Sequence, residues 1–197
     1  RQQQMQAAAP ESAQLGMPAS RLVVLGATVP PGLSLPTSDS IGIDDADRTH
    51  PVAGARLGAP RRLELAAARD GKDPNYVRKR VDLAVAARDS GARRVGVMVS
   101  SLDVARAVHT ALVKVDEATV LVTSRMRPFD RREVNALLTP DGDGIELPQF
   151  TVATQTLEVG VDVSFDALVT EICPWPALVQ RFGRLNRDGA LTEATGW

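Results

Sequence analysis

The stretch from Thr151 to Arg187, TVATQTLEVGVDVSFDALVTEICPWPALVQRFGRLNR, decides the fold of this 197-residue chain. It joins two short apolar runs through a polar turn and ends in a segment with helical periodicity. Gln180, Arg184 and Arg187 fall at i, i+4 and i+7 and predict one polar face of a helix. Guanidinium groups match phosphate oxygens, so this face is a candidate anion site. An ordinary solvated arginine face explains the spacing of this helix alone equally well.

The composition limits the classes of function. Hydrophobic residues at 44% and charged residues at 24% are typical of a globular protein that buries a core. Aromatic residues make up 4%, which argues against nucleic-acid binding through stacked aromatic platforms. The net charge of -1 does not attract a polyanion in bulk, so any anion site must be local. Because no run approaches about 18 apolar residues and no signal peptide opens the chain, we expect a cytoplasmic protein with no membrane partner.

Two features bear on metal binding. Cys173 is the single cysteine, which excludes an internal disulfide and a cysteine-based metal site, and we expect it in the core. Asp44, Asp45 and Asp47 could bind a metal, but no histidine or glutamate lies at ligand spacing nearby. We interpret the three aspartates as a solvated acidic loop and expect no metal site.

From Arg61 onward, short apolar runs alternate with helical periods, which predicts an α/β fold with a parallel sheet and crossover helices. The expected strands are Arg62–Ala67, Arg94–Ser100, Thr119–Thr123, Gln149–Ala153 and Ala167–Ile172. Helices are expected after Asp73, after Asp103, around Val134 and after Pro174. Because parallel strands end at one edge of a sheet, the loops that begin at Ser100, Ser124 and Thr154 should gather there as one polyanion site.

In this order, the residues resemble the second RecA-like domain of superfamily 2 helicases. Gly26-Ala27-Thr28 is similar to motif III, residues 97–101 to motif IV, residues 153–162 to motif V and residues 180–187 to motif VI. The phrases ATQTLEVGVDVSFDALVTE and QRFGRLNRDG are most similar to the helicase-nuclease subunit of type I CRISPR systems, in wording nearest its type I-U branch.

The resemblance implies a domain organisation and an activity. We expect a RecA-like parallel sheet flanked by helices, with residues 1–31 ending a first RecA-like domain, 32–60 forming a connector and 61–197 forming the second domain. The implied activity is ATP-dependent helicase or translocase action on single-stranded DNA in type I CRISPR interference. The implied partners are single-stranded DNA and the type I CRISPR surveillance complex.

The resemblance also implies a role for each motif residue. Arg184 and Arg187 would reach the γ-phosphate of ATP, and Gln180 would orient either these arginines or the attacking water. Gly160 and Asp162 would border the ribose and phosphates. The path of a single DNA strand would be lined by Ser100, Arg125, Thr154 and Thr156.

The chain departs from the helicase pattern in several ways. It contains no G-x-x-x-x-G-K-[ST] phosphate loop, no acidic motif II and no histidine-aspartate nuclease cluster, and Gly26 replaces the usual serine of motif III. We therefore interpret the chain as part of a longer polypeptide whose first domain would bind most of the ATP and Mg²⁺. Alone, it should hydrolyse neither ATP nor DNA.

Two other interpretations stay open. One is a different superfamily 2 helicase, acting on RNA or in DNA repair. The other is a RecA-like module that has lost ATPase function and serves as a scaffold or docking domain. A phosphate loop and an acidic motif upstream of Arg1 would separate the enzymes from the scaffold.

Overall fold

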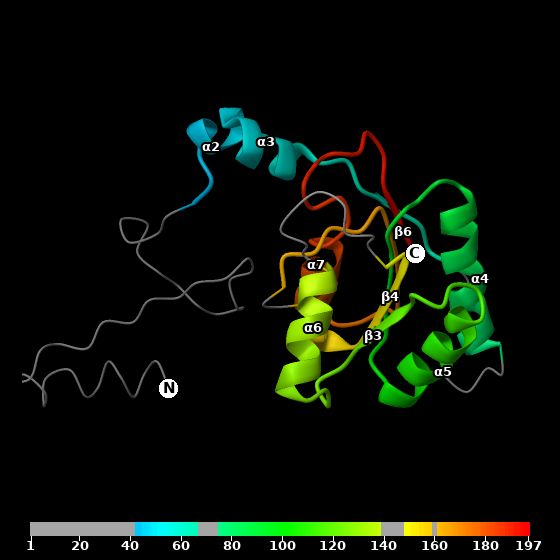
Figure 1. Ribbon diagram of the computed structural model, residues 1–197. Coiled ribbons are helices and arrows are strands. Elements are labelled where there is room, and N and C mark those ends of the chain that lie inside the picture. The colour runs from blue at the N-terminus through cyan, green and yellow to red at the C-terminus, as the bar shows by residue number, and fades with distance from the viewer. Residues whose placement is uncertain (1–41, 67–74, 139–147, 159–160) are drawn as a thin grey trace, which may run out of the picture. The chain divides into compact units, whose positions relative to one another are not determined.

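The computed structural model describes residues 42–66, 75–138, 148–158 and 161–197 (Figure 1). The chain divides into two units, Arg1–Ser40 and Ile41–Trp197. The first unit, with the motif III-like residues 26–28, lies outside the described residues, as do Asp73 and Gly160. The predicted domain limits therefore stay predictions, and only the second unit is described below.

The described elements follow the expected alternation of strands and helices. In chain order they are α2 (Asp45–Thr49), α3 (Pro51–Gly58), β1 (Arg62–Leu63), α4 (Tyr76–Asp89), β2 (Val95–Met98), α5 (Leu102–Val113), β3 (Val120–Val122), α6 (Pro128–Leu138), β4 (Phe150–Ala153), the 3₁₀ helix η2 (Gln155–Leu157), β5 (Ala167–Thr170), α7 (Trp175–Phe182) and β6 (Thr195–Gly196). None of the helices in these ranges has the length and apolarity that a membrane span requires.

The strands form one six-stranded parallel sheet in the order β1-β6-β5-β2-β4-β3. In the centre, Val95 of β2 aligns with Phe150 of β4 on one side and Ala167 of β5 on the other. This confirms the predicted α/β fold with a parallel sheet. Strand β6 was not predicted, because two residues are too short to carry an alternating pattern. It is defined only by its pairing with β1 and β5.

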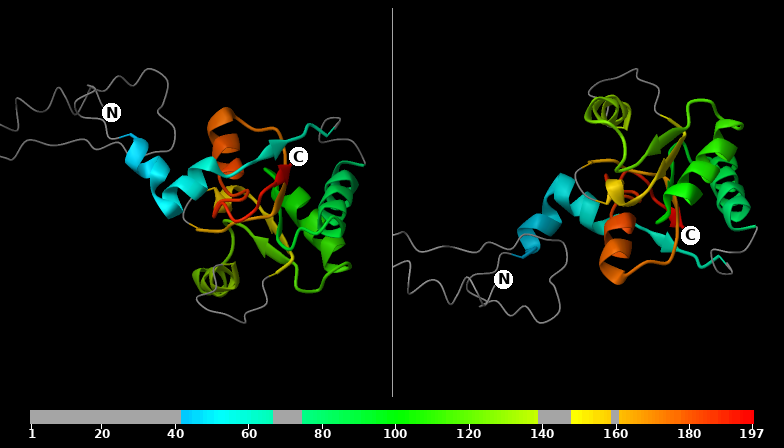
Figure 2. Two further views of the ribbon diagram at one scale, coloured as in Figure 1. Left: turned by 90° about the horizontal axis from the view of Figure 1, so that it is seen from above. Right: turned by 90° about the horizontal axis from the view of Figure 1, so that it is seen from below.

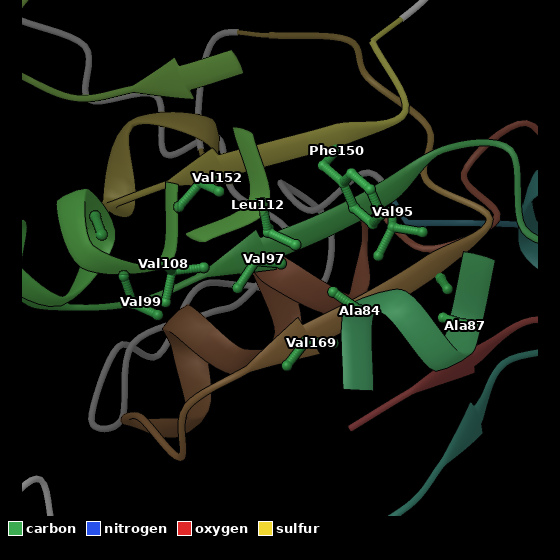
Figure 3. Packing of buried hydrophobic residues seen from close by; sticks show 12 residues of the cluster. Ala84, Ala87, Val95, Val97, Val99, Val108, Leu112, Phe150, Val152 and Val169 are labelled. Carbon is green, nitrogen blue, oxygen red and sulfur yellow. The ribbon is translucent and has the colours of Figure 1, made fainter. Parts of the chain in front are cut away.

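Helices cover both faces of the sheet. Figures 1 and 2 show α4 and α5 on one side and α6 and α7 on the other. Successive strand residues point to opposite faces, so Val95 and Val97 pack toward α4 and α5 while Met98 packs on the other side. The labelled members of the first cluster interdigitate in Figure 3. Strands buried on both faces explain the continuous apolar runs in the sequence.

One glycine of β2 is required by packing. A Cβ atom on Gly96 would lie 2.8 Å from the ring of Phe165, closer than van der Waals contact allows. Phe165 is itself 1% exposed. Because Gly96 has no side chain, the ring of Phe165, two residues before β5, can pack directly against β2.

Two helices occupy part of the segment expected to be a connector without sustained periodicity. Asp44 and Asp47 form a reciprocal capping box at the N-terminus of α2, which is a structural use of the acidic cluster. The Nδ1 of His50 accepts hydrogen bonds from the amides of Val52 and Ala53 and so caps α3, with Pro51 in the first turn. Side-chain caps, and not an apolar stripe, start these helices, which is why a periodicity search missed them.

The end of β5 differs from expectation. The strand was predicted to reach Ile172 but ends at Thr170, and Ile172 is 89% exposed. Cys173 was expected in the core and is only half-buried. Beyond Thr170 the chain leaves the sheet and leads into α7. Ile172 therefore belongs to the apolar run of the sequence but forms no strand pairing.

Candidate functional site

The arginine-rich segment after α7 is not a helix face, which corrects the interpretation based on periodicity. Helix α7 ends at Phe182, with Gly183 as its C-terminal cap. Leu185 instead forms a parallel bridge with Phe165, so the segment that carries Arg184 and Arg187 runs beside the chain that leads into β5. The periodicity predicted helical hydrogen bonds for this segment, but its backbone pairs with Phe165 instead. Leu185 is completely buried in this arrangement, and tertiary packing of this kind overrides local helix propensity. Gln180 remains on α7 and is half-buried.

Arg184 is a buried cation, with 6% of its surface exposed. Its Nε donates to the carbonyl of Leu157 at 3.0 Å, and its Nη2 donates to the carbonyl of Glu158 at 2.9 Å. Burial lowers the pKa of Arg184, and the nearby charge of Arg187 lowers it further. Arg184 therefore ties the motif VI-like segment to the end of η2, and its guanidinium is committed to main-chain carbonyls.

Arg187 is the more accessible of the two arginines. Its Nε donates to Oδ1 of Asp162, and the two side chains are 36% and 63% exposed. The hydrogen bond from Arg187 holds the pKa of the Asp162 carboxyl below its ordinary value. The backbone amide of Arg187 also donates to the hydroxyl of Ser164 at 3.0 Å. The structure thus brings together Asp162 and Arg187, which the resemblance to helicases assigns to one nucleotide site.

Arg61 adds a third guanidinium to this group. Its Nε donates to the carbonyl of Leu185 at 2.6 Å, and its Nη2 lies 3.4 Å from the carbonyl of Arg56 and 3.3 Å from that of Asn186. Burial lowers the pKa of Arg61, and so does the charge of Arg187. Among the residues that the structure describes, Asp162 is the only carboxylate within salt-bridge distance of Arg61, Arg184 or Arg187. The group carries excess positive charge.

A groove of about 550 Å³ adjoins this group. It lies between the α3–β1 segment and α7, and its lining includes Arg56, Arg61, Arg187, Leu63, Trp175 and Phe182. Trp175 is 72% exposed. The groove therefore joins an apolar floor to the cationic group.

The loops after β2, β3 and β4 form a second candidate site. These strands are neighbours and all run parallel, so their carboxyl ends meet at one edge, as predicted. Ser100 and Arg125 are exposed there. The hydroxyl of Thr156 donates to the carbonyl of Val122 at 3.0 Å, which joins the β4 loop to the end of β3. Thr154 is 6% exposed, so it supports this edge from within.

The two sites lie at opposite ends of β5. Arg184 to Arg187 pair with Ser164 and Phe165, which precede the first residue of β5, whereas Ser100 follows the last residue of β2. The loops that begin at Ser100, Ser124 and Thr154 gather at one edge as expected, and the segment from Arg184 to Arg187 is a separate group that Arg184 connects to the end of η2. Gly160 lies outside the described residues. Within the described ranges, no group of three histidine, cysteine or acidic side chains could hold a metal ion.

Comparison with known proteins identifies the family. The sequence model of a family described as "CRISPR-associated nuclease/helicase Cas3, C-terminal" matches residues 91–190, just over half of the chain. The chain belongs to this Cas3 family. The CRISPR-associated endonuclease/helicase Cas3 of Escherichia coli K12 is 35% identical over 119 residues, which are 57% of this chain and 13% of that protein. The matched regions span 6% to 17% of the curated Cas3 relatives.

Solved structures share the fold. The crystal structure of T. fusca Cas3 with ADP has a TM-score of 0.55 at 18% identity, covering 70% of this chain and 18% of that one. A chain of a CRISPR RNA-guided surveillance complex in a pre-nicking state has a TM-score of 0.50 at 19% identity, covering 69% of this chain and 18% of that one. These likenesses concern the fold, which the six-stranded sheet and its flanking helices share with parts of these solved chains.

Several residues that build the sites were missed by sequence reasoning. Arg61 precedes the region matched by the Cas3 model, and its side chain reaches Leu185 across a separation of 124 residues, so no local signal points to it. Arg181 lies within motif VI, is 1% exposed, and forms a 2.8 Å ion pair with Glu158. Its Nη1 also donates to the hydroxyl of Thr170 at 2.9 Å. An arginine directly after Gln180 in a Cas3 motif was the available clue.

Proposed function

We propose that this chain is the second RecA-like domain of an ATP-dependent Cas3-type translocase that acts on single-stranded DNA in type I CRISPR interference. Motor activity requires a nucleotide site and a strand-binding site that one domain holds together. The observation that carries the proposal is the pair of Arg187 and Asp162, with the guanidinium groups of Arg61 and Arg184 close enough to Arg187 for its charge to act on both. The separate polar edge at Ser100, Arg125 and Thr156 supports the second requirement.

The arginine group suits a polyphosphate. Arg61 and Arg184 are held by main-chain carbonyls, and their pKa values are lowered by burial and by the charge of Arg187. A bound anion would offset this repulsion. Arg187 is the member with exposed surface, so it would contact the γ-phosphate, and Asp162 would accept a hydrogen bond from the ribose. Gly160 would allow close backbone approach to the phosphates, and Gln180 would orient the arginines or the attacking water.

ATP with Mg²⁺ would be held mainly by a first RecA-like domain and would supply the free energy of phosphoryl transfer. The structure of T. fusca Cas3 with ADP supports a nucleotide in the family. Arg187 would stabilise the charge that develops on the transferred phosphoryl group, as an arginine finger does. Because Arg184 is buried beneath it, we assign Arg184 the role of holding the Arg187 segment against η2.

The edge of the sheet suits a nucleic-acid backbone. Ser100 and Arg125 are exposed at neighbouring loops, and a hydroxyl and a guanidinium bind phosphate without reading the bases. Thr154 and Thr156 would fix the β4 loop beside them. The solved surveillance complex with a similar chain supports the same complex as partner.

The decisive experiment is Arg187→Ala in a protein that contains this chain together with its first RecA-like domain. ATPase activity stimulated by single-stranded DNA should fall by about a thousandfold or more, because the finger is lost. DNA binding should change little, since Arg187 lies away from the strand edge. Arg106→Ala is the matched control, because Arg106 is an exposed arginine on α5 that belongs to neither proposed site.

Two outcomes would contradict the proposal. ATPase activity at the wild-type rate in Arg187→Ala would remove this arginine from the nucleotide site. A wild-type protein with no ATPase activity in the presence of single-stranded DNA would favour the scaffold interpretation.

A further inference from the structure

A buried carboxylate lies at the strand edge, outside the residues assigned above. Glu171 directly follows β5, and its side chain is 11% exposed. Oε1 accepts a hydrogen bond from the hydroxyl of Tyr76 at 2.6 Å. Oε2 accepts one from the backbone amide of Ser100 at 2.8 Å. One side chain thus links α4 to the loop that follows β2.

Helix α4 holds this carboxylate in place. Tyr76 and Arg80 are four residues apart and share one face of the helix. The guanidinium of Arg80 lies 3.4 Å from the centroid of the Tyr76 ring, and its Nη2 lies 3.7 Å from Oε1 of Glu171. The Arg80 side chain is 8% exposed, and its Nη1 donates to the carbonyl of Tyr76 at 2.8 Å. The charge of Glu171 is therefore balanced inside the protein.

Glu171 lies beside Ser100, a residue of the proposed DNA path, so its contacts bear on how that path is formed. A free carboxylate beside a DNA path would repel phosphates. Here both carboxylate oxygens are occupied, and the one on the Ser100 side holds the main chain from which the Ser100 hydroxyl projects. The same loop leads directly into α5, which begins at Leu102. A shift of the Ser100 amide would therefore move the exposed Ser100–Ser101 loop that follows β2.

We infer that Glu171 is a positioning residue that holds the Ser100–Ser101 loop in the conformation that binds single-stranded DNA, with Tyr76 and Arg80 of α4 as its support. The inference rests on the proposed function, because it requires this edge to bind DNA. Glu171 acts through Ser100 and does not contact the strand. It makes DNA affinity depend on a helix on the face of the sheet.

The test uses Glu171→Gln in a protein that contains this chain and its first RecA-like domain. Glutamine has nearly the same shape, but it removes the charge that pairs with Arg80 and can present an oxygen to only one of the two donors. The affinity for a fluorescein-labelled single-stranded DNA of mixed sequence should fall about tenfold. The DNA concentration for half-maximal ATPase should rise equally, while kcat at saturating DNA and nucleotide affinity without DNA stay within about twofold.

Salt dependence separates positioning from direct phosphate contact. If Glu171 acts only through the loop, the slope of log affinity against log salt should stay at its wild-type value in Glu171→Gln, because no cationic contact to phosphate is lost. Combining Glu171→Gln with Ser100→Ala should give less than the sum of the two losses, since one variant displaces the Ser100 hydroxyl from the DNA and the other removes that hydroxyl. Asp82→Asn is the control, a carboxylate removed from the exposed side of α4.

Tyr76→Phe keeps the inference testable if Glu171→Gln folds poorly. It removes the 2.6 Å hydrogen bond and leaves the Glu171–Ser100 contact, so a smaller loss of DNA affinity in the same direction is expected. A lower melting temperature with unchanged DNA affinity in both variants would show a merely structural role and overturn the inference. If the wild-type protein binds no single-stranded DNA, the proposed function fails first, which is a distinguishable result.

Discussion

Arg187 donates a hydrogen bond from its Nε to the carboxylate of Asp162, which joins two segments that lie 25 residues apart. This pair is the accessible part of the arginine group, while Arg184 beneath it is buried. A helicase of the Cas3 family would need an arginine that is held in place yet can reach a ligand. The Asp162–Arg187 pair has both properties, because the Arg187 amide is held by the hydroxyl of Ser164 while the two side chains are exposed.

Removing the charge of Asp162 should affect the rate of ATP hydrolysis much more than the free energy of unfolding. Asp162→Asn should lower the rate of DNA-stimulated ATP hydrolysis by about tenfold or more, because Arg187 loses its charged anchor. The free energy of unfolding should change by less than about 1 kcal/mol, since exposed ion pairs contribute little. Steady-state kinetics and urea unfolding measure the two effects, with Asp82→Asn as an exposed-carboxylate control. A large loss of stability with normal kinetics would make the pair structural.

Arg125 tests the strand edge. It is exposed after β3, and Arg125→Ala should weaken single-stranded DNA binding about equally for all sequences. The slope of log affinity against log salt should decrease by about one, because one phosphate contact is lost. Titrations at several salt concentrations with two DNA sequences measure both quantities, and Arg106→Ala serves as the control. A loss confined to one sequence would contradict a backbone contact.

The buried pair of Arg181 and Glu158 should be important for stability. Arg181 is 1% exposed and joins α7 to η2 and, through Thr170, to β5. Arg181→Met or Glu158→Gln alone should cost about 3–5 kcal/mol, because each leaves a buried charge or donor without its partner. The double variant should be less destabilised than the sum of the two. Urea unfolding of this chain measures the cycle, and single variants within about 1 kcal/mol of wild type would refute the prediction.

Glu171 predicts a dependence of stability on pH. Burial alone would raise its pKa, but hydrogen bonds from Tyr76 and Ser100 and the charge of Arg80 bring the pKa below the ordinary value of 4.5. Burial and the bond to Glu171 also raise the pKa of Tyr76 to about 12, so its hydroxyl remains a donor throughout the acid range. A lowered carboxyl pKa stabilises the folded state above the unfolded value, and this contribution is lost as the pH falls through the folded value.

The difference in unfolding free energy between wild type and Glu171→Gln should therefore be constant above about pH 5.5 and shrink below about pH 4.5. Urea unfolding of both proteins across this range measures it. A difference that grows on acidification would have the wrong sign and would exclude the carboxylate as the stabilising form. Asp82→Asn, on the exposed side of α4, should show no comparable trend.

The sequence by itself determined the sheet and the family. The runs around Val97, Leu121, Val152 and Leu168 carry strand signals within a few residues, and their alternation with helical periods predicted that these strands run parallel. The loops at Ser100, Arg125 and Thr156 followed, because parallel strands end at one edge. The motif V-like and motif VI-like residues identified the kind of helicase, which the family match confirms as Cas3.

Only the tertiary structure decided how the functional side chains are held. Helical spacing grouped Arg184 with Gln180, but pairing of Leu185 with Phe165 ends α7 at Phe182 and separates them. The contacts of Arg61 with Leu185 and of Glu171 with Ser100 join residues 124 and 71 positions apart. Such contacts depend on which segments the fold brings together, and local periodicity contains no information about them. The arginines of the opening stretch thus keep their expected chemistry, while the fold determines which one is buried and which one is exposed.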